Sequence, residues 1–395
     1  MTRDETSASK AEVSPLEIRG RIVSATSAFD DGVVSVRDRR IDHVRSLADW
    51  VAAHPDSIVP PFSGTVLPGL VDIHNHGGFG HRFDTVDGDE ARAAAEFHHT
   101  HGSTTVVASV VTGAATDMVA QVAALRELAI DATIGGIHAE GPFLAAARCG
   151  AQDPRYLRDP DLELTDRLLA AADGQLRVMT LAPELPGFDK VAQRLSDSGV
   201  VVSLGHSDTD YPVFRQSLHP NGFGSLVTHL ANGMPPLHHR EPGPAAAALV
   251  AAAQRQAVVE LIGDGVHIDS GFGALVFATA PGQVALITDA MQAAGMPDGE
   301  YRLGPQVVHV TDGVARVSNG SIAGGTAYLL KCLIWAVGAC GVPLRDAVIA
   351  ATSVPAAAAG LADVGDLRTD QFADLLIVDD NLQLRRVLRR GQWLT

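Results

Sequence analysis

One stretch of the chain decides the fold, Leu67-Pro68-Gly69-Leu70-Val71-Asp72-Ile73-His74-Asn75-His76-Gly77-Gly78. An apolar run leads into two histidines, and glycines follow at once. Side chains at positions i and i+2 of a β-strand leave the same face, so His74 and His76 point together. Imidazole is a common metal ligand, and α/β barrels keep their chemistry at strand ends. Taken alone, the pair also fits two polar residues in a strand-end turn.

The composition is that of a globular protein and excludes several partners. The 395 residues are 46% hydrophobic and 19% charged, and the formal net charge is −16. A chain without a basic field does not hold nucleic acid or an anionic membrane surface. No apolar run reaches the roughly 20 residues that a membrane span requires. We therefore expect neither nucleic acid nor a membrane as a partner.

The N-terminus and the cysteines indicate a cytoplasmic protein. Residues 1–15 are rich in Ser, Lys, Asp and Glu and lack an apolar core, so we expect a disordered tail and not a secretion signal. The three cysteines, Cys149, Cys332 and Cys340, are an odd number without metal-binding spacing. Such usage is typical of a reducing compartment.

The middle of the chain alternates apolar strands with Ala-rich helical stretches. We expect eight strands, at Val71–His76, Thr104–Val110, Ile134–His138, Arg177–Ala182, Val200–Leu204, Ser225–Thr228, Ala257–Ile262 and Val284–Thr288. Helical stretches such as Asp89–His99, Asp117–Leu128 and Pro244–Gln256 separate most of them. This pattern predicts an α/β fold, a (β/α)8 TIM-type barrel. A doubly wound open sheet is the alternative, although it usually has fewer strands.

Both ends of the chain show short alternating strands. We expect them at Glu17–Ile22, Gly32–Arg37 and Arg40–Val44, broken by Asp30-Asp31-Gly32, and again at 373–379 and Leu384–Leu388. These strands predict one small β-sandwich with the barrel inserted between its halves. The expected division is a tail at 1–15, the small domain at 16–65 plus 364–395, and the barrel at 66–363. A hairpin at Gln306–Val317 and helices at Thr326–Val337 and Leu344–Ala351 follow the eighth strand.

Polar groups that bind metals or move protons follow most of the barrel strands. They are His74 and His76 after the first, His138 and Glu140 after the third, His206 and Asp208 after the fifth, His229 and Asn232 after the sixth, Asp264 and His267 after the seventh, and Asp289 after the eighth. Each alone has an ordinary explanation as a turn or capping residue. A barrel directs all these ends to one mouth, so together they predict a divalent-metal site.

Lysine usage narrows the type of metal site. Some barrel hydrolases bridge two metals with a carbamylated lysine at a strand end. This chain has lysine only at Lys10, Lys190 and Lys331, and none of them ends a predicted strand. Glu140 is therefore the better bridging ligand.

Eight stretches together resemble a known family. They are Pro68–Gly77, Ile137–Phe143, Thr180–Glu184, Leu204–Asp208, Thr228–Met234, Arg240–Gly243, Asp264–His267 and Thr288–Ala290. Over nearly its whole length from about Leu16, the chain resembles the N-acetylglucosamine-6-phosphate deacetylases of the amidohydrolase superfamily. The resemblance implies hydrolysis of a linear amide, here to glucosamine 6-phosphate and acetate, in amino-sugar catabolism or recycling.

The resemblance also implies a metal site. Its core ligands would be Glu140, His206 and His229, with His74 and His76 adding a second metal, Glu140 bridging, and Asp289 close to the first metal. One or two divalent cations are expected, zinc first, with iron, manganese or cobalt also compatible with these donors. A metal-bound hydroxide would attack the acetamide carbonyl while Asp289 acts first as general base and then as general acid. His267 would polarise the carbonyl.

Substrate contacts follow from the same resemblance. Asn232, the Gly233 backbone and Arg240 would contact the sugar phosphate, and Arg240 would act across the interface of a homodimer. Ala323 and Gly324 belong to a segment that matches a substrate-lining stretch only loosely. Ala151 lies in an expected lid, next to Gln152, where many relatives have histidine, and close to Cys149, which is either an ordinary loop cysteine or a redox-sensitive residue at the entrance.

Two other interpretations keep the fold and change the function. One is an amidohydrolase that acts on another cyclic amide or N-acyl substrate; the missing strand-end lysine and the Asn232 and Arg240 pair argue against it. The other is a barrel that has lost catalysis and serves as a scaffold. The intact set of Glu140, His206, His229 and Asp289 argues against a scaffold.

Overall fold

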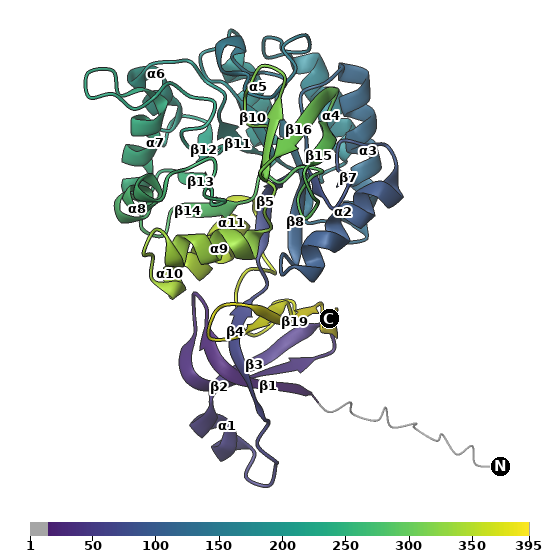
Figure 1. The fold of residues 1–395 in the computed structure, drawn as a ribbon, viewed down its shortest axis with the longest axis vertical. Coiled ribbons are helices and arrows are strands. Elements are labelled where there is room, and N and C mark those ends of the chain that lie inside the picture. Colours follow the sequence, from purple (N-terminus) through teal and green to yellow (C-terminus); the bar gives the residue numbers. More distant parts are fainter. Residues whose placement is uncertain (1–14, 395) are drawn as a thin grey trace, which may run out of the picture.

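A computed structural model describes residues 15–394, and its largest element is an eight-stranded parallel sheet. The strands are β5 (Val71–Asn75), β8 (Thr105–Val110), β9 (Gly136–Glu140), β10 (Leu176–Leu181), β11 (Val201–Leu204), β12 (Gly224–Val227), β13 (Val258–Ile262) and β14 (Val284–Ile287). They are neighbours in strict chain order, which a doubly wound sheet would not show. The predicted barrel is confirmed, with all eight strands near their expected positions (Figure 1).

The barrel closes just beyond the end of β14. The backbone N–H of Asp289 donates to the carbonyl oxygen of His74 at 3.0 Å, and the N–H of His76 donates to that of Ala290 at 2.7 Å. Residues that follow β14 therefore pair with His74 in β5 and with His76 just after it. This closure places Asp289 beside the His-x-His stretch.

Helices cover the outside of the barrel (Figure 1). They are α2 (Gly88–Thr100), α3 (Ala115–Ile130), α4 (Leu162–Ala172), α5 (Phe188–Asp197), α6 (Tyr211–Ser217), α7 (Gly243–Ala253), α8 (Ser270–Thr279), α9 (Leu329–Gly338), α10 (Leu344–Ala350) and α11 (Ser353–Ala358), with a 3-10 turn at Ala146–Arg148. Asp87, Asp161, Asp210 and Asp269 cap four of these helices by accepting first-turn N–H groups. The strands are buried on both faces, as parallel strands under helices must be.

A second, mixed sheet is built from both ends of the chain. Its order is β20 (Gln392–Trp393), β19 (Leu384–Arg389), β18 (Leu375–Val378), β4 (Phe62–Pro68), β1 (Leu16–Val23), β2 (Ala28–Arg37) and β3 (Arg40–Ser46), and α1 (Leu47–Ala53) follows β3. This confirms a small β unit made by both termini, which Figure 1 shows at one end of the barrel. The expected boundary between residues 65 and 66 stays a prediction, and the expected tail lies almost wholly outside the described residues.

One expected turn is wrong. Asp30-Asp31-Gly32 lies inside β2, and the actual turn closes where the N–H of Ser24 donates to the carbonyl oxygen of Ser27. Gly32 pairs with Gly20 across the strands, and a Cβ on Gly32 would approach the Arg45 carbonyl oxygen to 2.8 Å. The glycine is there for close packing inside the sheet, so the usual turn signal misleads.

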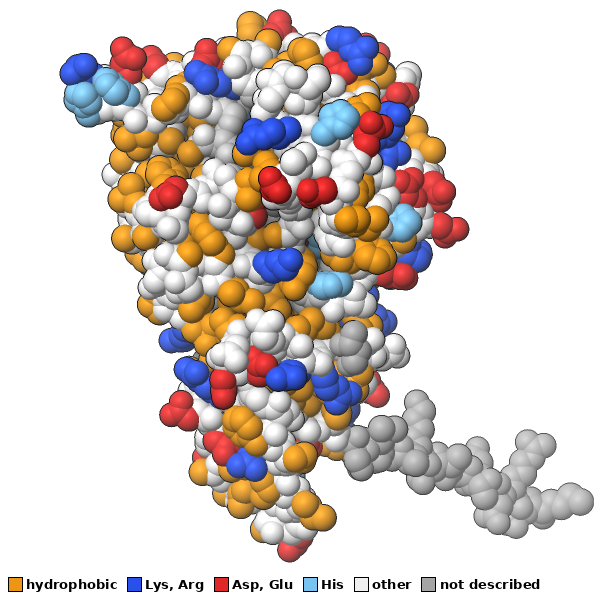
Figure 2. Space-filling view, viewed as in Figure 1, with side chains coloured by type: hydrophobic (Ala, Val, Ile, Leu, Met, Phe, Trp, Pro, Cys, Tyr) orange, Lys and Arg blue, Asp and Glu red, His pale blue; other side chains and the backbone are white. Residues whose placement is uncertain are grey.

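Two smaller sheets complete the chain. β15 (Gly299–Leu303), β16 (Gln306–Thr311) and β17 (Val314–Val317) form a three-stranded meander, one strand more than the expected hairpin, and β6 (Gly77–Gly78) pairs with β7 (His81–Arg82). On the face drawn in Figure 2, Lys and Arg are dispersed among Asp and Glu. Within residues 15–394, no helix has the length and apolarity needed to cross a lipid bilayer.

Candidate metal centre and active site

The six predicted metal-binding side chains lie at the carboxyl ends of barrel strands. His74 is in β5 and His76 follows it, Glu140 ends β9, His206 and His229 follow β11 and β12, and Asp289 follows β14. All six are buried. Because parallel strands leave the barrel at one mouth, residues far apart in the sequence meet there.

The turns beyond three of these strands are strained. His206, His229 and Asp289 have φ values of 48°, 28° and 48°, in the left-handed region that residues other than glycine rarely adopt. Strain of this kind concentrates at functional sites, where the surrounding structure holds it in place. Here it keeps each side chain at the barrel mouth.

Glu140 lies at the centre of the cluster. Its Oε1 is 3.0 Å from Nε2 of His206 and 3.0 Å from Nε2 of His229, and its Oε2 is 3.3 Å from Nε2 of His76. Two groups of potential ligands, His74 with His76 and His206 with His229, therefore share Glu140, and the ligand atoms of each group lie within 4.8 Å of one another. This is the geometry that a bridging carboxylate requires.

The Nε2 atoms of the cluster histidines lie close together in pairs, an arrangement that a bound cation would stabilise. The Nε2 atoms of His74 and His76 are 3.1 Å apart, and those of His206 and His229 are also 3.1 Å apart. Lone pairs that face each other at this distance are stabilised by a positive charge between them. The residues present therefore fit one or two divalent cations.

Both carboxylates of the cluster stay ionised. Burial by itself raises the pKa of Glu140, but the surrounding histidines outweigh burial and hold this pKa well below its usual range. Burial likewise opposes ionisation of Asp289, and His74 and His76 lower its pKa to about 2. Asp289 Oδ1 lies 3.2 Å from Nε2 of His76 and 3.4 Å from Nε2 of His74.

Groups behind the cluster orient two of its rings. Nδ1 of His74 lies 3.0 Å from Oε2 of Glu260, and Nδ1 of His206 donates to the carbonyl oxygen of Arg148 at 2.7 Å. Hydrogen bonds of this kind fix the tautomer that leaves Nε2 free for a metal. They also hold each ring in one orientation.

Two buried residues beside the cluster were absent from the predicted site. Nε2 of Gln152 donates to Glu140 Oε2 at 2.5 Å, and its Oε1 accepts the backbone N–H of Thr112 at 2.8 Å. Glu260, besides contacting His74, accepts the N–H of His229 at 3.1 Å. An acidic residue inside the apolar strand β13 was the available signal for Glu260. For Gln152 the available signal was its position in the expected lid, next to Ala151.

His138 lies within β9 and outside the cluster. Its Nδ1 is 2.9 Å from Ser109 Oγ, and its Nε2 is 2.8 Å from Thr180 Oγ1. Burial holds the pKa of His138 well below its usual range, so the ring is neutral. It packs edge-on against His74 and belongs to a buried hydroxyl network.

His267 forms a pair with Asp264. Its Nδ1 donates to Asp264 Oδ2 at 2.7 Å, and its backbone N–H donates to Asp264 Oδ1 at 2.9 Å. Burial lowers the pKa of His267, but the hydrogen bond and the charge of Asp264 more than offset burial, so the pKa lies above its ordinary value. The pair fixes the ring and leaves Nε2 as the second donor.

A cavity of about 250 Å³ adjoins the cluster. Its lining includes His76, Glu140, His206, His229, His267 and Asp289, together with the expected substrate contacts Ala151, Asn232, Gly233, Ala323 and Gly324. His74 is fully buried behind this lining. Arg240 lies elsewhere, in a separate cleft shared with Arg148 and Asp208. One subunit therefore brings together every predicted site residue except Arg240.

Two of the cavity glycines cannot carry a side chain. Gly233 has φ 58°, and a Cβ there would lie 2.9 Å from Nδ1 of His206. Gly324 has φ 100°, and its Cβ would lie 2.7 Å from the carbonyl oxygen of Asp289. Both positions need glycine because the backbone passes close to predicted ligands.

Comparison with known proteins decides the family. Residues 65–210 and 243–394 match the model of the amidohydrolase family. The chain is an amidohydrolase. An N-acetylglucosamine-6-phosphate deacetylase of Lysinibacillus sphaericus is 34% identical over 339 residues, 83% of this chain and 84% of the relative. An N-acetylgalactosamine-6-phosphate deacetylase of Escherichia coli O157:H7 is 33% identical, over 89% of this chain and 94% of the relative.

Solved structures agree with the sequence comparison. N-acetyl-D-glucosamine-6-phosphate deacetylase from Mycobacterium smegmatis superimposes on this amidohydrolase with a TM-score of 0.90 and 37% identity, covering 96% of this chain and 100% of the relative. A mutant of that relative has been solved in complex with N-acetyl-D-glucosamine-6-phosphate. The family expected from the eight sequence stretches is confirmed.

Proposed function

We propose that this amidohydrolase hydrolyses N-acetyl-D-glucosamine 6-phosphate to D-glucosamine 6-phosphate and acetate. The observation that carries the proposal is the buried cluster around Glu140, which lines a cavity. Relatives that match most of the chain are named for this reaction.

The cluster supplies the ligands for the metal. His74, His76, Glu140, His206 and His229, with Asp289 beside them, would hold one or two divalent cations. Zinc suits this donor set, and iron, manganese and cobalt share the same ligand preferences. A cation held there lowers the pKa of water and polarises the acyl oxygen of the substrate.

Asp289 is the proposed proton carrier. Its pKa of about 2 keeps it ionised at neutral pH, so it accepts the proton of the attacking water. The protonated carboxyl then delivers that proton to the departing amine, which could not leave as an anion. Its position in the cavity lining, 3.2 Å from His76, puts the proton transfer beside the metal ligands.

His267 is the proposed donor to the acyl oxygen. Because its Nδ1 is committed to Asp264, only Nε2 remains to donate into the cavity. A donor placed where negative charge develops stabilises the tetrahedral intermediate. The raised pKa of His267 favours the protonated ring for this task.

The remaining cavity residues would hold the sugar. Ala151, Asn232, Gly233, Ala323 and Gly324 line the space beside the cluster, and Arg240 would reach the phosphate of a substrate bound in the other subunit of a homodimer. A cytoplasmic location fits the proposal, since the three cysteines form no disulfide.

A second candidate substrate is the galactosamine epimer. The relative from Escherichia coli O157:H7, 33% identical to this chain, is an N-acetylgalactosamine-6-phosphate deacetylase. Both epimers present the same acetamide and phosphate, so the cluster serves either. Parallel assays of the two sugars, and of N-acyl amino acids and cyclic amides, separate these possibilities.

Replacing Asp289 with Asn tests the proposed reaction. The asparagine cannot accept the water's proton, so kcat for N-acetylglucosamine 6-phosphate should fall by about 10²–10⁴-fold while bound metal, measured by elemental analysis, stays close to that of the wild type. Full activity of Asp289→Asn contradicts the proposed role of Asp289. Failure of metal-loaded wild type to deacetylate this sugar contradicts the proposed substrate.

A further inference from the structure

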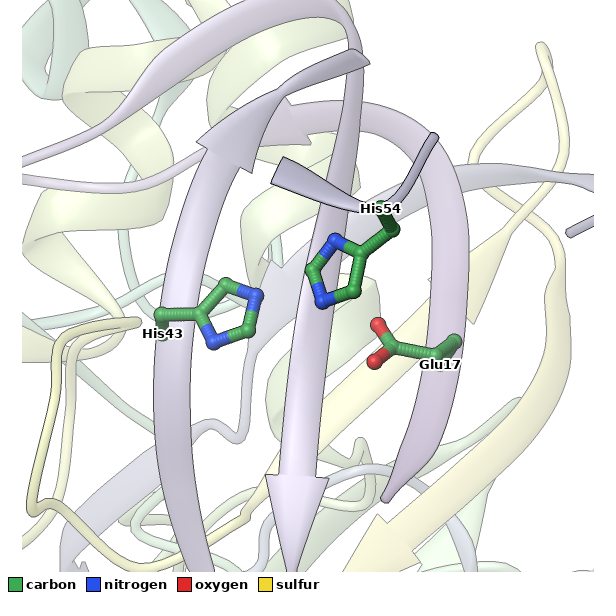
Figure 3. A group of neighbouring side chains, drawn as sticks. All are labelled: Glu17, His43 and His54. Carbon is green, nitrogen blue, oxygen red and sulfur yellow. The ribbon is translucent and has the colours of Figure 1, made fainter. Parts of the chain in front are cut away.

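A second group of metal-binding side chains lies in the small sheet. Glu17 is on β1, His43 is on β3, and His54 follows α1. Each offers one ligand atom, and these atoms lie within 4.8 Å of one another. Figure 3 shows both imidazole rings and the carboxylate turned toward one another. Figure 1 places α1 at the end of the molecule opposite the barrel, so this group is separate from the cavity.

Strand register aligns two of the three ligands. Glu17 pairs with Ser35 on β2, and Ser35 pairs with His43 on β3. Paired residues on adjacent strands share one face of the sheet, so Glu17 and His43 flank Ser35 on that face. The order of the strands therefore dictates this part of the cluster.

The end of α1 supplies the third ligand. His54 is the C-cap residue of α1, and its ring stacks on Trp50 with centroids 4.6 Å apart. The same ring lies nearly parallel to that of His43, at 5.9 Å. Its Nδ1 donates to the carbonyl oxygen of Trp50 at 2.9 Å, which leaves Nε2 as the nitrogen with a free lone pair.

The other two ligands are also held from behind. Oε2 of Glu17 accepts the indole N–H of Trp50 at 3.1 Å and the hydroxyl of Ser35 at 2.5 Å. Nδ1 of His43 lies 3.7 Å from the carboxylate of Asp42. Ligand histidines of known metal sites characteristically direct their second nitrogen at a carbonyl or a carboxylate, as His54 does through the carbonyl oxygen of Trp50.

The cluster leaves a lone pair available to an ion. Nε2 of His54 has no hydrogen-bond partner among residues 15–394, whereas Nδ1 of the same ring is committed to Trp50. In addition, all three ligands are only half-buried, so an ion can enter from solvent. Among residues 15–394, the hydrogen bond that a metal would replace joins His43 Nε2 to Ser35 Oγ at 2.8 Å, and the metal would displace the proton of that nitrogen.

We propose that Glu17, His43 and His54 bind a divalent transition-metal ion of the zinc type. Two imidazole nitrogens and one carboxylate form a donor set that zinc accepts, with a further coordination position left for water. The ion would tie the end of α1 to β1 and β3. The inference is independent of the proposed deacetylation, because none of the three residues contacts the barrel cluster.

Zinc titration of the full-length protein, with its barrel site already metal-loaded, tests this proposal. The variants are Glu17→Gln, which retains an oxygen acceptor for Trp50 and Ser35, and His54→Gln. The matched control is His219→Gln, which removes an exposed histidine elsewhere. Calorimetry, elemental analysis and thermal unfolding are measured for all four proteins, together with the deacetylation rate.

Wild type and His219→Gln should each carry one zinc ion more than Glu17→Gln and His54→Gln. Where the zinc content is equal, wild type and His219→Gln should bind the added zinc at least about tenfold more tightly. Added zinc should raise Tm for the first pair only, because an ion that binds the folded state alone stabilises that state. Deacetylation rates should be equal in all four. Equal zinc content and equal Tm shifts in all four proteins would overturn the proposal, as would zinc uptake at this site only at millimolar concentration.

Discussion

His267 shows how one neighbouring residue sets the chemistry of another. Asp264 lies three positions earlier and holds both the ring nitrogen Nδ1 and the backbone N–H of His267. The pKa of His267 is raised because this carboxylate outweighs burial. A cationic ring is the better donor to a developing oxyanion, so the rate should fall as the pH rises past this pKa.

The variant Asp264→Asn isolates that effect. The amide still accepts a hydrogen bond but carries no charge, so the pKa of His267 should fall and the alkaline limb of the kcat–pH profile should move to lower pH. The profile is measured on fully metal-loaded protein. Asp269→Asn is the control, because it makes the same change of charge at a residue that caps α8 through the N–H of Gly271. An alkaline limb that does not move would show that the charge of His267 does not limit the rate.

At the scale of strands and helices, periodicity predicted what is buried but not which buried polar groups meet. All eight barrel strands are apolar runs, and each was found. The three residues from Asp30 to Gly32 were misread because a glycine that permits close strand packing resembles a turn glycine.

β15 (Gly299–Leu303) was missed because most of its side chains are exposed and show no apolar alternation. Glu260 was missed because its partners lie on other strands.

Glu260 connects three elements of the barrel. It projects from β13, contacts Nδ1 of His74 on β5, and accepts the N–H of His229 beyond β12. Glu260→Gln keeps the shape and loses the charge that orients His74, so metal affinity should fall by about 10–100-fold. Metal titration with a fluorescent competitor measures the change, and the exposed Glu96→Gln on α2 is the control. Unchanged metal affinity in Glu260→Gln would contradict the positioning role.

At the scale of the whole molecule, barrel geometry predicted the convergence of residues on strand ends, whereas the position of Arg240 was expected from the family resemblance alone. Barrel geometry forces strand ends together, so the metal cluster followed from the strand assignment. Arg240 lies in the loop between β12 and α7, exposed, with Nη1 2.8 Å from His239 Nε2. No rule of barrel geometry places such a loop. Under the proposed function, Arg240 reaches the substrate phosphate of a second subunit.

Subunit mixing tests whether Arg240 acts across a dimer. Arg240→Ala alone should raise KM about 10–100-fold, because a hydrogen bond to a charged group is lost. Asp289→Asn alone should be inactive. A mixed dimer, however, pairs an intact Asp289 in one subunit with an intact Arg240 in the other, so co-refolding the two variants should restore one working site of low KM. Sedimentation verifies the dimer. If the mixture shows only the sum of the two separate activities, Arg240 serves its own subunit, and the loop between β12 and α7 must instead close over the cavity that its own barrel forms.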